Sequence, residues 1–285
     1  MDQMNLAAWE NRTETRSGGV SLQVAQMAQA TLDAPQAAIE TGHVLPALWH
    51  WFAFLPQTPT NDLGHDGHPP LGGFLPQVHL ERRMWAGGKL TFHKPIHVGE
   101  TLKRTSTIRS VTEKVGAAGR MVFVSVDHEI FGESGLAIKE RQDIVYLAIP
   151  DHYAPPRKQD AFAAPDFDEA VETTPTLLFR YSALTFNAHR IHYDLPYAQT
   201  VEHYPGLVVH GPLQATMLID AASRHVGRAP DRFSFRGVHP VFAGEPTQIM
   251  GQRVDTNTLE LCTAVTGDGA AYQGMQANAV WEDTP

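Results

Sequence analysis

Cysteine is almost absent from this 285-residue sequence, in which Cys262 is the only one. A single cysteine excludes an internal disulfide and is typical of a reducing compartment. Long apolar runs are missing too, since no stretch approaches the ~20 residues that a membrane-spanning helix needs. The first ten residues contain acids and no apolar core of a signal peptide. We therefore expect a cytoplasmic protein without a membrane partner.

Basic side chains are also scarce, because 22 Lys and Arg face 31 Asp and Glu and leave a formal charge of −9. This charge argues against nucleic acid as a partner, since phosphate binding needs a basic surface. An anionic small molecule would need a local cluster of cations. The candidates for such a cluster are Arg82, Arg83, Lys89, Lys94, Lys103, Arg104 and Arg253.

Apolar residues make up 42% of the chain, which is enough for a sizeable core. Alternating, β-branched runs separated by glycine-containing turns predict strands. These are residues 89–93, 101–111, 121–130 and 136–148, and then 233–241, 247–254, 259–265 and 271–281. Helical spacing predicts an amphipathic helix within residues 1–40, best over 20–39, and two further helices over 45–55 and 213–222. The aromatic residues of the second helix are expected to lie in the core.

The chain repeats its own order. Pro95-x-x-x-Gly99-Glu100 is answered by Pro240-x-x-x-Gly244-Glu245, and in each half a predicted helix precedes a run of strands. One helix followed by several antiparallel strands, twice, predicts an α+β repeat in which each sheet wraps its helix. The predicted organisation is a first half over residues 1–150, a Pro- and acid-rich linker over 151–175, and a second half over 176–285.

Two segments of the second half concentrate reactive side chains. In the first, Asn187, His189, His192 and Asp194 fall within eight residues. An imidazole beside an amide or a carboxylate is suited to moving a proton to or from water or a carbon acid. A histidine-rich turn that satisfies its own backbone would also explain the pattern, and Asp194 by itself is expected to cap a helix.

The second segment places His210-Gly211-Pro212 between a strand-like run and a helical period. Proline suits the first helical turn, and Gly211 leaves backbone N–H groups open at a helix N-terminus. That position favours a developing negative charge, such as a thioester enolate. The alternative is an ordinary buried helix entered through a Gly-Pro turn.

Together the two segments resemble the MaoC-like, R-specific enoyl-CoA hydratase family of hot-dog-fold proteins. That family carries Asp-x-Asn-Pro-Ile/Leu-His, followed by His-Gly at the start of a long central helix. Here Asn187-Ala-His-Arg-Ile-His192 occupies the first motif and His210-Gly211 the second. The chain is most similar to the branch of mesaconyl-C4-CoA and itaconyl-CoA hydratases and mitochondrial-type hydroxyacyl-thioester dehydratases. Asn187 departs from the family by standing where most members have a catalytic Asp.

The resemblance implies a double hot-dog fold, in which the first half is degenerate and only forms the wall of the acyl and CoA pocket. It implies that His192 is the catalytic base and that the Gly211 N–H polarises the thioester carbonyl. Asn187 would hold the water, because an amide can orient water but cannot accept its proton at neutral pH. The residues expected to bind substrate are Tyr181, His189, Arg190, His210, Arg82, Arg83 and Trp85. Tyr181, Ser182 and Thr185 are expected to be strand and pocket packing rather than nucleophiles.

The implied reaction is the reversible hydration of an α,β-unsaturated acyl-CoA, with a short dicarboxylic substrate such as itaconyl-CoA or mesaconyl-C4-CoA. It needs no cofactor beyond the CoA of the substrate, and a homodimer or larger homo-oligomer is expected. The open alternatives are a medium- or long-chain 3-hydroxyacyl-thioester dehydratase, a hot-dog thioesterase and a non-catalytic CoA-binding protein.

One motif lies outside this scheme. His65-Asp66-Gly67-His68 stands in a long loop, residues 56–76, and two histidines with an Asp between them suggest a metal. No third ligand follows at a recognised zinc spacing, so no metal site is expected. Loops of this length tend to be functional lids or linkers.

Overall fold

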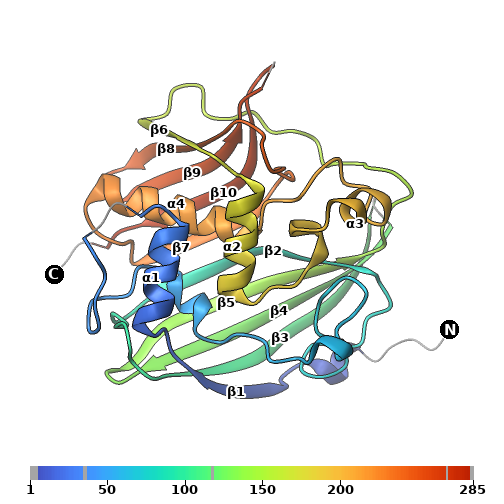
Figure 1. The fold of residues 1–285 in the computed structure, drawn as a ribbon, viewed down its shortest axis with the longest axis horizontal. Coiled ribbons are helices and arrows are strands. Elements are labelled where there is room, and N and C mark those ends of the chain that lie inside the picture. Colours follow the sequence, from blue (N-terminus) through green and yellow to red (C-terminus); the bar gives the residue numbers. More distant parts are fainter. Residues whose placement is uncertain (1–5, 35–36, 117–118, 268, 283–285) are drawn as a thin grey trace.

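One antiparallel sheet organises residues 6–34, 37–116, 119–267 and 269–282, which this computed structural model describes. The strands of the first half are β1 (Thr13–Gly18), β2 (Arg82–Phe92), β3 (Leu102–Gly116), β4 (Gly119–Gly132) and β5 (Gly135–Leu147). Those of the second half are β6 (Phe167–Val171), β7 (Arg232–Gly237), β8 (Thr247–Asp255), β9 (Thr258–Val265) and β10 (Tyr272–Val280). Figure 1 shows the outer strands of the first set in the lower part of the view and those of the second set in the upper part, with β2 and β7 between them at the level of the helices.

The two halves of the sheet have the same strand order. Counted outward from the centre, β2-β5-β4-β3-β1 is matched by β7-β10-β9-β8-β6, and the pairing of β2 with β7 joins them. The Pro-x-x-x-Gly-Glu turn also recurs in three dimensions, because Gly99 and Gly244 have φ values of 89° and 85°. Glu100 and Glu245 each accept a hydrogen bond from the backbone N–H three residues earlier. The predicted internal repeat and the α+β class are therefore confirmed.

The predicted strands are confirmed within a few residues, apart from the longer N-terminal part of β2. The periodicity of the strands explains this agreement, since every second side chain of β4 from Val122 to Ile130 is buried, with His128 among the valines and isoleucine. The predicted central helix is confirmed as α4 (Gly211–Val226), which packs on β8, β9 and β10. It ends at Gly227, whose φ of 86° closes the helix in the left-handed conformation.

The predicted helix over residues 45–55 is wrong, except for a single 3-10 turn over Trp49–Phe52. Leu48 precedes this turn with a φ of 68°, a left-handed conformation from which a right-handed helix cannot continue. Trp49 and Phe52 are nevertheless buried, which confirms their place in the core. Among its described residues the first half therefore contains no long counterpart of α4. An irregular connection of residues 53–81, broken by one short 3-10 turn (Thr60–Asp62), follows instead.

The amphipathic helix predicted within residues 1–40 is also wrong in extent. The described part of that segment contains β1 and a ten-residue helix, α1 (Leu22–Thr31), while residues 1–5, 35 and 36 lie outside the described residues. Ser21 caps α1, because its side chain accepts a hydrogen bond from the Val24 N–H.

Two further expectations change in the connection between the halves. Residues 151–175, expected to be a linker, include β6, which pairs with β8 at the edge of the sheet. The stretch around Tyr181, expected to be a strand, lies in α2 (Pro175–Thr185). Thr174 caps this helix and Pro175 opens it, so the local sequence carries a helix-start signal that the aromatic residues obscured.

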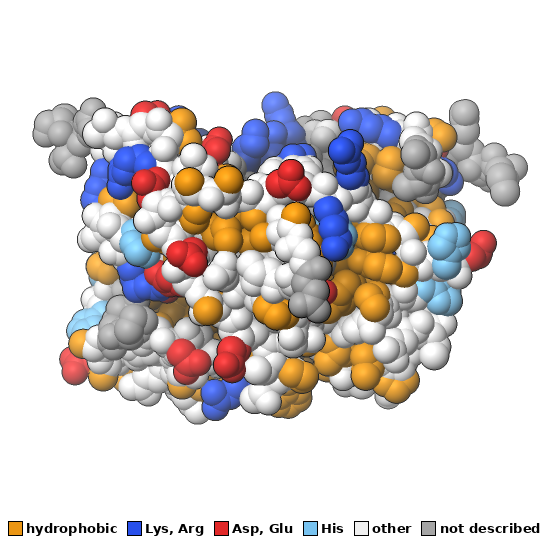
Figure 2. Space-filling model, turned by 90° about the horizontal axis from the view of Figure 1, so that it is seen from above, with side chains coloured by type: hydrophobic (Ala, Val, Ile, Leu, Met, Phe, Trp, Pro, Cys, Tyr) orange, Lys and Arg blue, Asp and Glu red, His pale blue; other side chains and the backbone are white. Residues whose placement is uncertain are grey.

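No helix of the described chain is both long enough and apolar enough to span a bilayer. On the face shown in Figure 2, side chains of both charges lie among apolar ones.

Candidate active site

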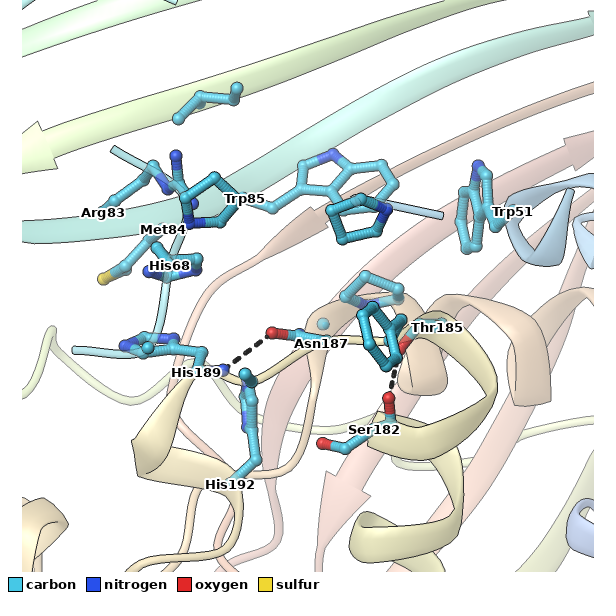
Figure 3. A pocket seen from close by; sticks show the side chains of 18 of the residues that line it. Trp51, His68, Arg83, Met84, Trp85, Ser182, Thr185, Asn187, His189 and His192 are labelled. Atoms are coloured by element: carbon cyan, nitrogen blue, oxygen red, sulfur yellow. Dashed lines mark hydrogen bonds between the residues drawn. The ribbon is translucent and has the colours of Figure 1, made fainter. Parts of the chain in front are cut away.

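A cleft of about 2520 Å³ runs between the two halves. Its walls include the connection after the Trp49–Phe52 turn, the start of β2, the end of α2 with the segment that follows it, and the start of α4. Figure 3 shows His68, Arg83 and Trp85 on one wall and Ser182, Asn187 and His192 on the other. Pockets for small ligands usually measure about 300–1,000 Å³, so this cleft has room for a bulky ligand.

His192 lies at the end of a 3-10 turn, Arg190–His192, and lines the cleft. Its Nδ1 lies 2.7 Å from the carbonyl oxygen of Val208. A carbonyl can only accept, so Nδ1 carries the proton and Nε2 keeps a lone pair. Burial, followed by the neighbouring His210 and His189, lowers the pKa of His192 well below its ordinary value. At neutral pH this residue is therefore a neutral imidazole with a fixed tautomer, as a general base requires.

His210 does not bind substrate in this geometry. It is fully buried and stacks on His192, with ring centroids 3.6 Å apart, and it is not among the residues that line the cleft. Its Nε2 lies 2.8 Å from the Ser182 hydroxyl, and burial lowers its pKa to about 3. His210 is a neutral support that holds the His192 ring from behind, which corrects its predicted role.

Gly211 is the first residue of α4 and lines the cleft. Its N–H makes no hydrogen bond with the described residues, as expected for a first-turn amide whose partner would lie outside the helix. A Cβ at this position would stand 3.7 Å from the Trp85 carbonyl oxygen of β2. The helix N-terminus therefore opens into the cleft close to the opposite wall, where an anionic oxygen would be stabilised.

Asn187 follows directly on α2. Phe186 closes this helix with a φ of 48°, and the chain turns so that the Asn187 side chain lines the cleft. Its Oδ1 accepts a hydrogen bond from the His189 N–H at 3.0 Å (Figure 3). No partner of its NH₂ group is found among the described residues. The amide therefore fixes the motif loop with its oxygen and offers two donors to the cleft.

Replacing Asn187 by Asp should be tolerated, with activity within about tenfold of the wild type, or above it. An aspartate oxygen can still accept the His189 N–H, and the new carboxylate can accept from water. Steady-state kinetics of Asn187→Asp checks this prediction. Asn187→Leu is measured beside it as the variant that has neither the oxygen acceptor nor the NH₂ donors. A complete loss of activity in Asn187→Asp would show instead that the NH₂ donors are essential.

His189 is buried between two other imidazoles, with ring centroids 4.1 Å from His68 and 5.4 Å from His192. Its Nε2 has no hydrogen-bond partner among the residues that the structure describes, and it lies 3.8 Å from a carboxylate oxygen of Glu202. His189 lines the cleft, where it lies between the rings of His68 and His192.

Arg82 lines the cleft, but its guanidinium is engaged. It donates to the Glu202 carboxylate at 2.7 Å and to the Glu202 carbonyl at 2.6 Å, and its Cζ lies 4.6 Å from the centre of the Tyr204 ring. Glu202 is 1% exposed. This buried ion pair makes Arg82 a structural residue, not the substrate ligand that the sequence suggested.

Arg190 is also misplaced as a substrate ligand, since it does not line the cleft. Its guanidinium pairs with Asp194 at 2.8 Å and donates to the His65 carbonyl at 3.0 Å. Asp194 caps the short helix α3 (Leu195–Thr200) by accepting from the Tyr197 N–H, which confirms its predicted capping role. Arg190 thus ties the first-half loop to the motif segment.

Arg83, Trp85 and Tyr181 line the cleft as predicted. The Trp85 ring packs against the Trp51 ring, with the ring centroids 4.9 Å apart, and Tyr181 is buried beside Phe52. Of the arginines that line the cleft, Arg82 pairs with Glu202, and Arg16 and Arg104 pair with Glu14. Arg83 has no carboxylate within 4.0 Å among the described residues, so its charge is available to a ligand. Of the other candidate cations, Lys89, Lys94, Lys103 and Arg253 do not line the cleft.

The structure brings to the site a pair, Asp66 and His68, for which no metal role was expected. His68, from the first half, lines the cleft and stacks on His189 of the second half. Asp66, His68 and His189 place one ligand atom each within 4.8 Å of one another, a group among the described residues that could hold a metal ion. The third member of this group is His189, which lies too far along the chain for any spacing rule to find.

Comparisons with known proteins show the family of this chain. Residues 48–243 match the family described as hydroxyacyl-thioester dehydratase type 2. The chain is similar to mesaconyl-C(4)-CoA hydratase from Chloroflexus aurantiacus, with 44% identity over 90% of this chain and 93% of the relative. It is 29% identical to the mitochondrial hydroxyacyl-thioester dehydratase type 2 of Schizosaccharomyces pombe, over 77% and 79% of the two chains.

Solved structures support the fold alone, because their identities are low. A MaoC-like dehydratase from Phytophthora capsici matches with a TM-score of 0.66 and 15% identity, over 99% of this chain and 100% of the other. A Mycobacterium tuberculosis protein described as a double hot-dog fold matches with a TM-score of 0.60 and 13% identity, over 95% and 96%. The predicted double hot-dog fold is thereby confirmed, and the chain belongs to the hydroxyacyl-thioester dehydratase type 2 family.

Proposed function

We propose that this protein catalyses the reversible addition of water to the conjugated double bond of an acyl-CoA thioester. The observation that carries the proposal is the pairing of two groups on one cleft. His192 presents an unprotonated Nε2 whose tautomer is locked by Val208, and Gly211 presents a free N–H at the start of α4. A base and an oxyanion donor are the two groups that this addition requires.

In the hydration direction, Nε2 of His192 takes one proton from water while the water oxygen bonds to C3. The electron pair of the double bond moves through C2 to the thioester oxygen, which the Gly211 N–H stabilises. The His192 imidazolium then returns the proton to C2, so that the product contains one added water. The chemistry uses no cofactor beyond the CoA of the substrate.

We further propose that the acyl group is a short dicarboxylic one, as in mesaconyl-C4-CoA or itaconyl-CoA. The Chloroflexus relative is named for the first of these. In mesaconyl-C4-CoA the free carboxylate is bonded to the carbon that receives the hydroxyl, so its receptor must lie close to the reacting centre. Arg83 is such a receptor, since it lines the cleft without a carboxylate partner and its charge acts on the neighbouring His68.

The thioesterase alternative lacks its usual group at the cleft. Thioesterases of this fold lean on a carboxylate of the central helix, and Asp220 is the acid that α4 offers. Asp220 does not line the cleft and forms an ion pair with Arg224 one turn later. No position near the start of α4 therefore supplies a carboxylate nucleophile or base.

The test is a panel of itaconyl-, mesaconyl-C4-, crotonyl- and decenoyl-CoA. Hydration is measured as the gain of one water in the mass of the thioester and, for the conjugated substrates, as loss of the enoyl-thioester absorbance, while hydrolysis is measured separately as free-thiol release. Absorbance should fall without thiol release. A charge-assisted arginine–carboxylate pair contributes about 1.5–3 kcal/mol, so kcat/KM should be at least about tenfold higher for a dicarboxylic substrate. Arg83→Met should remove that preference and leave crotonyl-CoA hydration largely unchanged. A preference that rises steadily with chain length would instead support the long-chain dehydratase.

A further inference from the structure

We propose that Asp66 and His68, from the loop of the first half, provide the second hydrogen-bond acceptor for the attacking water. They would replace the carboxylate that the family motif has at position 187, where this chain has Asn. The inference rests on the proposed hydratase function and adds a catalytic residue, His68, with a positioning residue, Asp66.

The first observation is the geometry of the pair. The Asp66 carboxylate accepts from Nδ1 of His68 at 2.8 Å through one oxygen and from the His68 backbone N–H at 3.0 Å through the other. An ionised carboxylate only accepts, so Nδ1 holds the proton and Nε2 keeps its lone pair. Nε2 has no hydrogen-bond partner in the described part of the chain, and the ring lines the cleft. His68 therefore offers the cleft an acceptor with a fixed tautomer.

The second observation is that this loop is fastened to the catalytic motif of the other half. The Arg190 N–H donates to the Asp66 carbonyl at 2.9 Å, and the Arg190 guanidinium donates to the His65 carbonyl at 3.0 Å. Gly67 has a φ of 87° and lies so close to Ala188 that a Cβ would stand 1.8 Å from the Ala188 carbonyl oxygen. Only glycine permits this approach, and it places His68 against the segment that carries Asn187 and His189.

The third observation is the position of His68 opposite His192. Figure 3 shows His68 beside Arg83 and Met84 of β2 and His192 across the cleft, with His189 between the two rings. A water molecule that attacks a substrate held between these walls has two O–H groups to place. His192 takes the proton of one, and Nε2 of His68 is the acceptor for the other.

The charges around His68 keep it an acceptor at neutral pH. Burial and then Arg83 lower the pKa of His68 to about 3, although the Asp66 hydrogen bond acts in the opposite sense. Burial would raise the pKa of Asp66, but the hydrogen bonds and charge of His68 lower it, so Asp66 stays ionised. His189 is the other titratable group at the ring, and its influence also lowers the pKa of His68.

The proton balance is that of the proposed hydration. One water proton goes to His192 and then to C2, while the water oxygen bonds to C3. The second proton remains on that oxygen, hydrogen-bonded to Nε2 of His68, and becomes the proton of the product hydroxyl. His68 stays neutral throughout, as does the Asn187 amide.

The test compares His68→Phe with His68→Phe/Asn187→Asp. Phenylalanine keeps a ring against His189 but removes the acceptor, so kcat should fall by about 10²-fold with KM nearly unchanged. A carboxylate at position 187 restores the lost acceptor, so the double variant should regain at least about tenfold in kcat. His65→Phe is the matched control, because His65 is exposed, does not line the cleft and should retain wild-type activity.

Thermal unfolding shows whether each variant is folded. If His68→Phe does not fold, Asp66→Asn/His68→Phe replaces it in the comparison, because that double variant leaves no unpaired carboxylate at position 66. Activity of His68→Phe near that of the wild type would overturn the inference, and so would a loss that Asn187→Asp does not rescue. Stoichiometric zinc whose removal abolishes activity would overturn it in favour of a metal site. Wild-type protein and His192→Ala in the same assay test the proposed function separately.

Discussion

Replacement of His192 by alanine should lower kcat for hydration by about 10²-fold or more while the protein still folds. The reason is that Nε2 of His192 is the base of the proposed reaction, and its tautomer is fixed by the bond from Nδ1 to Val208. Its loss removes the proton carrier but leaves the Gly211 donor and the cleft in place. Steady-state or stopped-flow measurement of the enoyl-thioester absorbance gives the decrease in kcat.

The matched control for that experiment is His225→Ala. His225 lies on α4 outside the cleft and pairs with Glu169 at 2.7 Å, so its loss should leave kcat unchanged. Thermal unfolding shows whether both variants are folded. This check matters for His192→Ala, because the His210 ring loses the ring on which it stacks. Near-normal hydration by folded His192→Ala would refute the assignment of the base.

Arg82→Met should destabilise the protein by about 3–5 kcal/mol, as removal of one partner of a buried ion pair does. Glu202 is almost fully buried and would keep its charge with only His189 nearby. Denaturant unfolding measures the change. Arg120→Met is the control, because Arg120 also donates two hydrogen bonds to one glutamate, both of them to the Glu113 carboxylate, but at the surface, where ion pairs contribute little to stability.

This prediction has a pH signature. Burial would raise the pKa of Glu202, but His189 and Arg82 lower it below the ordinary value of 4.5. A lowered folded-state pKa stabilises the protein above the unfolded-state pKa, and this contribution is lost as the pH falls through the folded-state value. The deficit of Arg82→Met should therefore be full at neutral pH and shrink as the pH falls below about 4.5. A deficit that is constant down to acidic pH would contradict the role of the ion pair.

Local patterns in the sequence determined much of the fold. The spacing of two in β4 and in its neighbours, the Pro-x-x-x-Gly-Glu turns and the Gly-Pro start of α4 are short-range signals, and each predicted its element correctly. The proposed catalytic motif belongs with them, since Asn187 and His192 are separated by only four residues and line one cleft together. Side-chain periodicity and turn chemistry act over a few residues, which is why the sequence alone carries them.

Only the tertiary structure decided which charges are free. Arg82, Arg83 and Arg190 are equivalent in the sequence, but Glu202 engages the first and Asp194 the third, leaving Arg83 for a ligand. In the same way His68 and His189 are 121 positions apart in the sequence. Their ring centroids lie 4.1 Å apart because hydrogen bonds hold residues 65–68 against residues 188–190. These side chains meet because β2 pairs with β7 and so joins the two halves of the chain. Such a contact between distant parts of the sequence is not encoded by any local pattern.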